Sequence, residues 1–146
     1  MTHALAPFPA TLGVALLALS MAAPAWSTEP KTHFVDHSSD LLIGAETARK
    51  VMADNVPARV WKVYPATKFA IVSQALGGMN GTTCVVSARV MLMPVSPAVK
   101  AVLFRPQKTA TAYDAALNSS TEQCKTMARG KLKEATLALV SALVKT

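Results

Sequence analysis

Two histidines and two carboxylates lie close together near the start of the chain, where they could bind a metal ion. His33, Asp36, His37 and Asp40 fall within eight consecutive residues. Histidines four residues apart would share one face of a helix, and imidazole with carboxylate is a ligand set that suits Zn²⁺ or Cu²⁺. A metal-binding role for His33, Asp36 and His37 is one hypothesis. The alternative is a polar arm that binds no metal.

Cys84 and Cys124 are the only cysteines of the chain. An exported protein with an even number of cysteines usually pairs them, and two cysteines allow one connectivity. A disulfide between them would close a loop of about 40 residues and stabilise the fold by about 4 kcal/mol in the chain-entropy estimate. A reactive or metal-binding thiol pair is the alternative, but neither cysteine lies in a Cys-x-x-Cys spacing or next to a histidine. We therefore expect a structural disulfide between Cys84 and Cys124.

Basic residues dominate the charge of the chain, with 15 Lys and Arg against 8 Asp and Glu. Lys125, Arg129 and Lys133 follow an i, i+4, i+8 spacing, which predicts a cationic stripe on a helix. Such a stripe could bind an anionic partner, such as a lipid headgroup, a cell-wall polymer or an acidic envelope protein. The alternative is an ordinary solvated helix face. Nucleic acid is a less favoured partner, because no strand with interleaved aromatic residues is apparent.

Residues that could perform catalysis are sparse. There is no Gly-x-Ser-x-Gly motif, and the acidic residues are dispersed along the chain. The two histidines outside the leader lie in the arm, where packing would not hold a catalytic base in position. We expect no catalytic residue and no cofactor. A small hydrolase would need carboxylates that converge from distant parts of the sequence.

Residues 1–27 contain no Asp, Glu, Lys or Arg and include the apolar run Leu12–Leu19. This length matches the core of a signal peptide and is too short for a membrane-spanning helix. Small residues favour cleavage after Ser27, or alternatively after Ala25, although an uncleaved anchor is a further possibility. The prediction is a protein of the periplasm, or a secreted one, with no transmembrane segment in the mature chain. Residues 28–40 would form a polar arm and residues 41–146 a single domain.

The domain itself is expected to begin with a helix over residues 41–55, whose apolar residues have helical spacing. Ser38, Ser39 and Asp40 are all suitable residues for its N-cap. Residues 58–64 are rich in β-branched and aromatic types and predict a strand. Residues 67–76 and 82–93 predict two further strands around the turn-forming segment 77–81, and we expect them to pair as an antiparallel hairpin.

The alternation within each of these two strands assigns its side chains to two faces. In the first strand one face would carry Phe69, Ile71 and Ser73, and the other Ala70, Val72 and Gln74. In the second strand one face would carry Cys84, Val86, Ala88, Val90 and Leu92, and the other Val85, Ser87, Arg89, Met91 and Met93.

The last third of the chain predicts one more strand and a long helix. Residues 100–105 are apolar and are expected to form a fourth strand, while residues 107–118 could continue as a strand or form a helical turn. A capping box, either Ser119 with Glu122 or Ser120 with Gln123, would begin a helix that runs to about residue 144.

This order predicts a two-layer α+β fold: an N-terminal helix, an antiparallel sheet of three or four strands, a long C-terminal helix and one disulfide. The arrangement resembles in architecture the C-terminal domain of TolA. The resemblance lies in two short segments, Thr83-Cys84-Val85-Val86 and Glu122-Gln123-Cys124. From these features we expect a non-catalytic binding or accessory protein, with periplasmic metal binding as the alternative.

Overall fold

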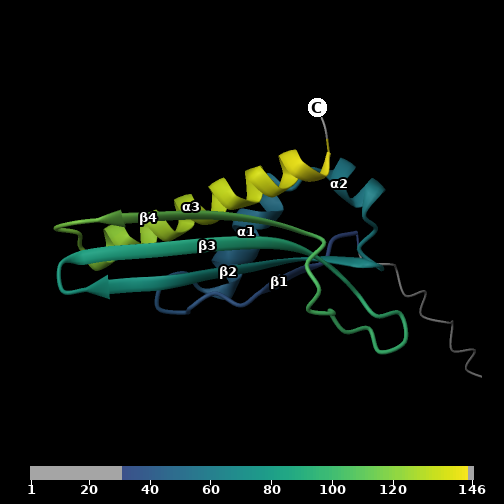
Figure 1. The fold of residues 1–146 in the computed structure, drawn as a ribbon, viewed down its shortest axis with the longest axis horizontal. Helices are drawn as coiled ribbons and strands as arrows, with labels where there is room; N and C mark the ends of the chain where they lie inside the picture. Colours follow the sequence, from purple (N-terminus) through teal and green to yellow (C-terminus); the bar gives the residue numbers. More distant parts are fainter. Residues whose placement is uncertain (1–30, 145–146) are drawn as a thin grey trace, which may run out of the picture.

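The computed structural model describes residues 31–144, which fold into one four-stranded sheet with helices packed on one of its faces (Figure 1). The strands lie in the order β1-β2-β3-β4 across the sheet, with the bounds Phe34–Asp36, Phe69–Asn80, Thr83–Pro94 and Lys108–Ala116. The helices are α1 (Ala45–Asn55), α2 (Ala58–Val63) and α3 (Thr121–Leu143). The predicted two-layer α+β class is confirmed.

The hairpin predicted from the alternation is confirmed. Strands β2 and β3 pair antiparallel from Phe69–Pro94 at one end to Asn80–Thr83 at the other. Strand β2 is longer than expected at the tip, because the glycine-rich segment 77–80 continues the ladder rather than turning, whereas β3 begins at Thr83, one residue later than expected. The face under the helices, which we call the inner face, buries Ile71, Ala75, Cys84, Val86, Ala88, Val90 and Leu92. The opposite, outer face carries a smaller cluster of Ala70, Val72, Met91 and Met93.

The fourth strand lies later in the chain than expected. Residues 108–116 form β4, antiparallel to β3, whereas the strand predicted at residues 100–105 is wrong. Apart from an isolated bridge between Val95 and Val102, residues 95–107 form a loop, which we call the outer loop. Val95 and Val102 pack on the outer-face cluster. The apolar character of this segment therefore reflects contact with the sheet and not strand pairing.

The first strand, β1, comes from the polar arm and makes the sheet mixed. It runs parallel to β2, with Phe34 opposite Ile71 and Asp36 opposite Ser73. The Asp36 carboxylate accepts hydrogen bonds from the hydroxyls of Ser38 and Ser73. Ser73 is fully buried, so this carboxylate satisfies a polar group that would otherwise be unpaired. Phe34 and Val35 have strand propensity, but this short segment depends on long-range contacts for its place in the sheet.

The two N-terminal helices differ from expectation in different ways. Helix α1 begins at Ala45 with Gly44 as its N-cap, because the Ser39 carbonyl accepts bonds from Leu42 and Ile43 in a preceding turn. Ser38, Ser39 and Asp40 therefore do not cap it. The strand predicted at residues 58–64 is wrong, since residues 58–63 form α2. Helical spacing buries Val60 and packs Trp61 edge-to-face against Phe34, with the two ring centroids 5.4 Å apart.

Helix α3 lies along the inner face and is joined to it by the predicted disulfide. The sulfur atoms of Cys84 in β3 and Cys124 in α3 are bonded, and the two Cα atoms lie 5.6 Å apart. Of the two capping boxes considered, the structure contains Ser120 with Gln123. The buried stripe of the helix includes Ala128, Leu132, Ala135 and Leu139, which complete the main core.

Candidate functional site

The three predicted metal ligands lie on one short stretch of extended chain that does not bring them together. The Asp36 side chain bonds to Ser38 and Ser73, and a ring nitrogen of His33 lies 3.3 Å from the carbonyl oxygen of Ala66. His37 is exposed. Four residues of extended chain separate the two histidine positions by about 13 Å, whereas a helix would have placed them on adjacent turns. Among residues 31–144, no group of three His, Cys, Asp or Glu side chains could hold a metal ion.

The predicted cationic stripe is present on α3, but acidic side chains lie close to it. The Lys125 ammonium lies 2.9 Å from Glu122 and, through this hydrogen bond, holds the pKa of the Glu122 carboxyl below its usual value. The Arg129 guanidinium donates a bond to the Thr126 hydroxyl at 2.9 Å. Lys133 is exposed.

Beside the stripe, Lys131 bridges two acidic groups, at 2.8 Å from Glu134 and 3.1 Å from Asp114. The hydrogen bond to Glu134 and, after it, the hydrogen bond to Asp114 raise the pKa of the Lys131 ammonium. The hydrogen bond from Lys131 in turn lowers the pKa of the Asp114 carboxyl. Lys131 is thus balanced by its neighbours, whereas within the stripe only Lys125 forms an ion pair.

The net charge of the protein is located elsewhere. Residues 55–113 contain seven of the 15 basic residues and none of the 8 acidic ones, so the rest of the chain holds equal numbers of both. The seven are all exposed: Arg59, Lys62, Lys68, Arg89, Lys100, Arg105 and Lys108. None of these seven forms an ion pair within residues 31–144. The lysines that do are Lys50, Lys125 and Lys131. The whole formal charge of +7 therefore lies on this acid-free segment, without local compensation.

Three of these cations belong to the outer face and its loop. Arg89 occupies the middle of the outer face, in register between Gln74 of β2 and Thr111 of β4. Lys100 and Arg105 lie in the outer loop, which hangs from the end of the sheet on the side of β1 and β2, away from α3 (Figure 1). We call Arg89, Lys100 and Arg105 the outer cations.

Exposed apolar side chains accompany the outer cations. Val99 and Phe104 of the outer loop are 72% and 74% exposed, and Leu103 is 42% exposed. At the opposite end of the outer face, Leu76, Val85 and Tyr113 are also exposed. The three in the outer loop lie within six consecutive residues, and exposed apolar groups that gather, rather than being scattered singly, are typical of an interaction surface.

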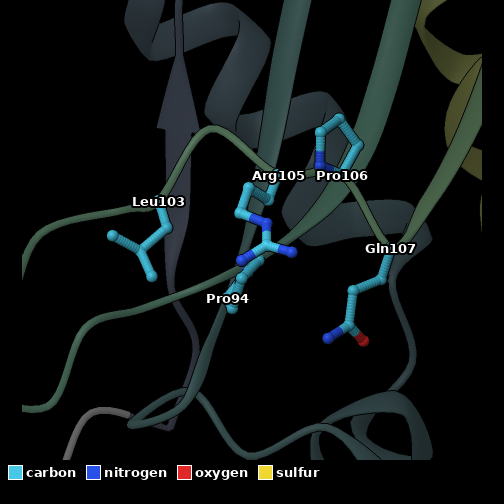
Figure 2. Close-up of a pocket in the computed structure, with 5 residues that line it drawn as sticks. All are labelled: Pro94, Leu103, Arg105, Pro106 and Gln107. Carbon is cyan, nitrogen blue, oxygen red and sulfur yellow. The ribbon is translucent and has the colours of Figure 1, made fainter.

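Two hollows flank the outer loop. One, of about 570 Å³, is lined by Pro94, Leu103, Arg105, Pro106 and Gln107. Figure 2 shows the Arg105 side chain extending over Pro94, between Leu103 and Gln107, so that its guanidinium faces the open space. The second hollow, of about 430 Å³, lies between Phe104 and the outer-face residues His37, Gln74 and Met91. Both hollows combine apolar walls with a few polar groups, the usual composition of binding pockets.

Sequence reasoning placed the anionic-partner site on α3 and did not identify the outer loop. Two signals in the sequence point to it: the absence of acidic residues between Asp54 and Asp114, and the position of Arg89 on the strand face that carries Met91 and Met93. The first requires only a count of charges along the chain.

Comparisons with known proteins find only weak similarity of fold. No protein-family model matches the chain, and a search of curated proteins finds no significant match. Among solved structures, a variant of the PelC dodecamer from Paraburkholderia phytofirmans is similar with a TM-score of 0.40 and 12% identity, covering 77% of this chain and 95% of that one. A predicted lipoprotein from Caulobacter crescentus gives a TM-score of 0.34 and 8% identity, with 75% and 82% covered. Similarity at this level assigns neither family nor function.

Proposed function

We propose that this chain is an exported, non-catalytic binding protein that recognises an anionic component of the cell envelope. The observation that carries the proposal is the location of the entire net charge on the acid-free segment 55–113, where its cations are exposed and uncompensated. Uncompensated charge of one sign raises the local concentration of oppositely charged partners and speeds their association. Lipid headgroups, cell-wall polymers and acidic envelope proteins all have the required charge.

Two features support export. A disulfide between Cys84 and Cys124 is typical of proteins in oxidising compartments such as the periplasm or the exterior of the cell. The predicted signal peptide, with cleavage near Ser27, lies outside the described residues. No helix within residues 31–144 combines the length and the apolarity needed to cross a bilayer.

The buried hydroxyls of residues 31–144 serve the fold. Ser73 and Thr136 each make a structural hydrogen bond, to Asp36 and to the Leu132 carbonyl respectively. The exposed cations and apolar groups of the outer face are instead available to a partner.

Two charge-reversal variants test the proposal with matched net charge. Arg89, Lys100 and Arg105 are changed to Glu in the first, and Lys125, Arg129 and Lys133 in the second, so that both lose six units of charge. Binding of the exported protein to anionic phospholipid vesicles, lipopolysaccharide and peptidoglycan sacculi is then measured by cosedimentation at several salt concentrations.

The proposal predicts salt-sensitive binding to at least one anionic probe, with a loss in the first variant that greatly exceeds the loss in the second. Equal losses would mean that net charge alone matters, and a larger loss in the second would assign the site to α3. Absence of binding to every anionic probe at low salt would contradict the proposed function itself.

A further inference from the structure

The outer loop holds its apolar side chains in the solvent although it is anchored to the sheet. Val95 and Val102 pack into the outer-face cluster. Backbone bonds from Ser96 to the Ala101 carbonyl, and from Lys100 to the Ser96 carbonyl, close the loop between them. Lys100 adopts a positive φ of 54°, which lets the chain reverse at this point. The exposure of Val99, Leu103 and Phe104 is therefore part of a folded loop.

The order of residue types along this loop places apolar groups directly beside cations. Val99 precedes Lys100, and Leu103 and Phe104 precede Arg105. A polyanionic polymer would be recognised by cations alone, and the apolar groups would then remain in water. The interface of an anionic bilayer accepts both, because apolar side chains enter the acyl boundary while Lys and Arg remain at the headgroup phosphates.

The charge of the surface also opposes a symmetric contact between the outer faces of two copies of the chain. Two outer faces in contact would bring Arg89, Lys100 and Arg105 of each copy together, with no acidic residue in the segment 55–113 to compensate them. Like charges directly opposed across an interface are strongly unfavourable. The occupant must therefore supply negative charge.

We propose that the outer loop docks the protein on the surface of an anionic phospholipid bilayer. This inference rests on the proposed recognition of an anionic envelope component and names the partner. Phe104, Leu103 and Val99 enter the boundary between headgroups and acyl chains. Arg105, whose guanidinium faces the hollow it shares with Gln107 in Figure 2, binds a headgroup phosphate. A guanidinium suits this role because its planar fork donates two parallel hydrogen bonds to phosphate oxygens.

Partitioning onto vesicles tests the apolar part of the surface. The variant Leu103→Ser/Phe104→Ser is compared with the control Leu76→Ser/Val85→Ser, which removes two exposed apolar side chains from the other end of the outer face. We expect the loop variant to lose affinity for phosphatidylglycerol-containing vesicles by about tenfold or more, and the control to change by less than about threefold. All proteins are purified from the same compartment, and their N-termini are checked by mass spectrometry, so that the leader contributes equally.

Fluorescence then reports which end of the surface enters the membrane. Phe104→Trp should show a blue shift on addition of anionic vesicles and quenching by brominated lipids. Tyr113→Trp, at the far end of the outer face, should show neither. Vesicles of phosphatidylcholine alone should give no change in either variant.

Three results would overturn the inference. These are binding to sacculi or to an acidic envelope protein without vesicle binding, equal losses in the two serine variants, and a spectral shift at position 113 that matches the shift at position 104. The first result would leave the proposed function intact. Absence of binding to every anionic probe would contradict both the proposed function and this inference.

Discussion

Gly77 lies within β2 at a φ of +119°, which L-residues with a side chain rarely adopt. A Cβ atom added there would collide with the carbonyl oxygen of Val85 and lie 3.0 Å from its carbonyl carbon, both in the backbone of β3. Gly77→Ala therefore combines backbone strain of about 1–3 kcal/mol with displacement of a paired strand, which weakens a hydrogen bond worth about 1 kcal/mol. We expect it to lower the free energy of unfolding by about 2–4 kcal/mol.

Two other glycines separate the causes. Gly78 has a φ of +146° but open space around its Cα, so Gly78→Ala should cost about 1–2 kcal/mol from strain alone. Gly130, inside α3, also has open space and no unusual φ, so Gly130→Ala should stabilise the protein by about 0.5–1 kcal/mol. Urea denaturation of the three oxidised variants, followed by circular dichroism, gives these values. An unfolding free energy for Gly77→Ala equal to that of the wild type, or a lowered one for Gly130→Ala, would refute the reasoning.

Three further predictions concern the disulfide, the helix cap and one ion pair. Replacing Cys84 and Cys124 together by alanine should lower the free energy of unfolding by about 4 kcal/mol, because the bond closes a loop with a separation of 40 residues, and urea denaturation measures this loss. Ser120→Ala should cost about 1 kcal/mol in the same assay, since it removes the side-chain acceptor of the first turn of α3. Lys131→Met should raise the pKa of Asp114, seen by carbon NMR titration, because Lys131 is the main cause of its lowered pKa. In the wild type the stabilisation from Asp114 should be complete above its unfolded pKa of about 3.9 and be lost as the pH falls through the lower folded value.

The parts of the fold that follow from local pattern were predicted correctly. Alternation in residues 69–93 identified the hairpin and the two faces of each strand, and the sequence around Ser120 identified α3, with its capping box as one of two alternatives. The errors arose where tertiary contact decides the structure. Residues 58–63 have strand propensity but form α2, because a helix buries Val60 and packs Trp61 on Phe34. Strand β1 depends on the bond between Asp36 and the buried Ser73, which lie 37 residues apart.

The candidate site on α3 stays a prediction, and the spacing on which it rests carries limited information. The i, i+4, i+8 spacing finds cations on one helix, but it does not reveal whether acidic groups from other elements neutralise that helix. Asp114 of β4 reaches Lys131 of α3 only because β4 pairs with β3 beneath the helix. The apolar residues of the segment 100–105 predict a strand, but in the structure this segment belongs to the outer loop. Only the fold distinguishes Val102, which packs on the sheet, from Phe104, which faces the solvent.

The affinities of the two triple charge-reversal variants for one anionic probe test the central claim most directly. Each cation near an anionic surface contributes about 1 kcal/mol, so reversal of Arg89, Lys100 and Arg105 should weaken binding by about 100-fold or more. Reversal of Lys125, Arg129 and Lys133 should weaken it by less than about tenfold, because Glu122 already pairs with Lys125 and the residues outside the segment 55–113 carry equal numbers of acidic and basic groups. Equal affinities for the two variants, or the weaker binding in the α3 variant, would contradict recognition by the outer face.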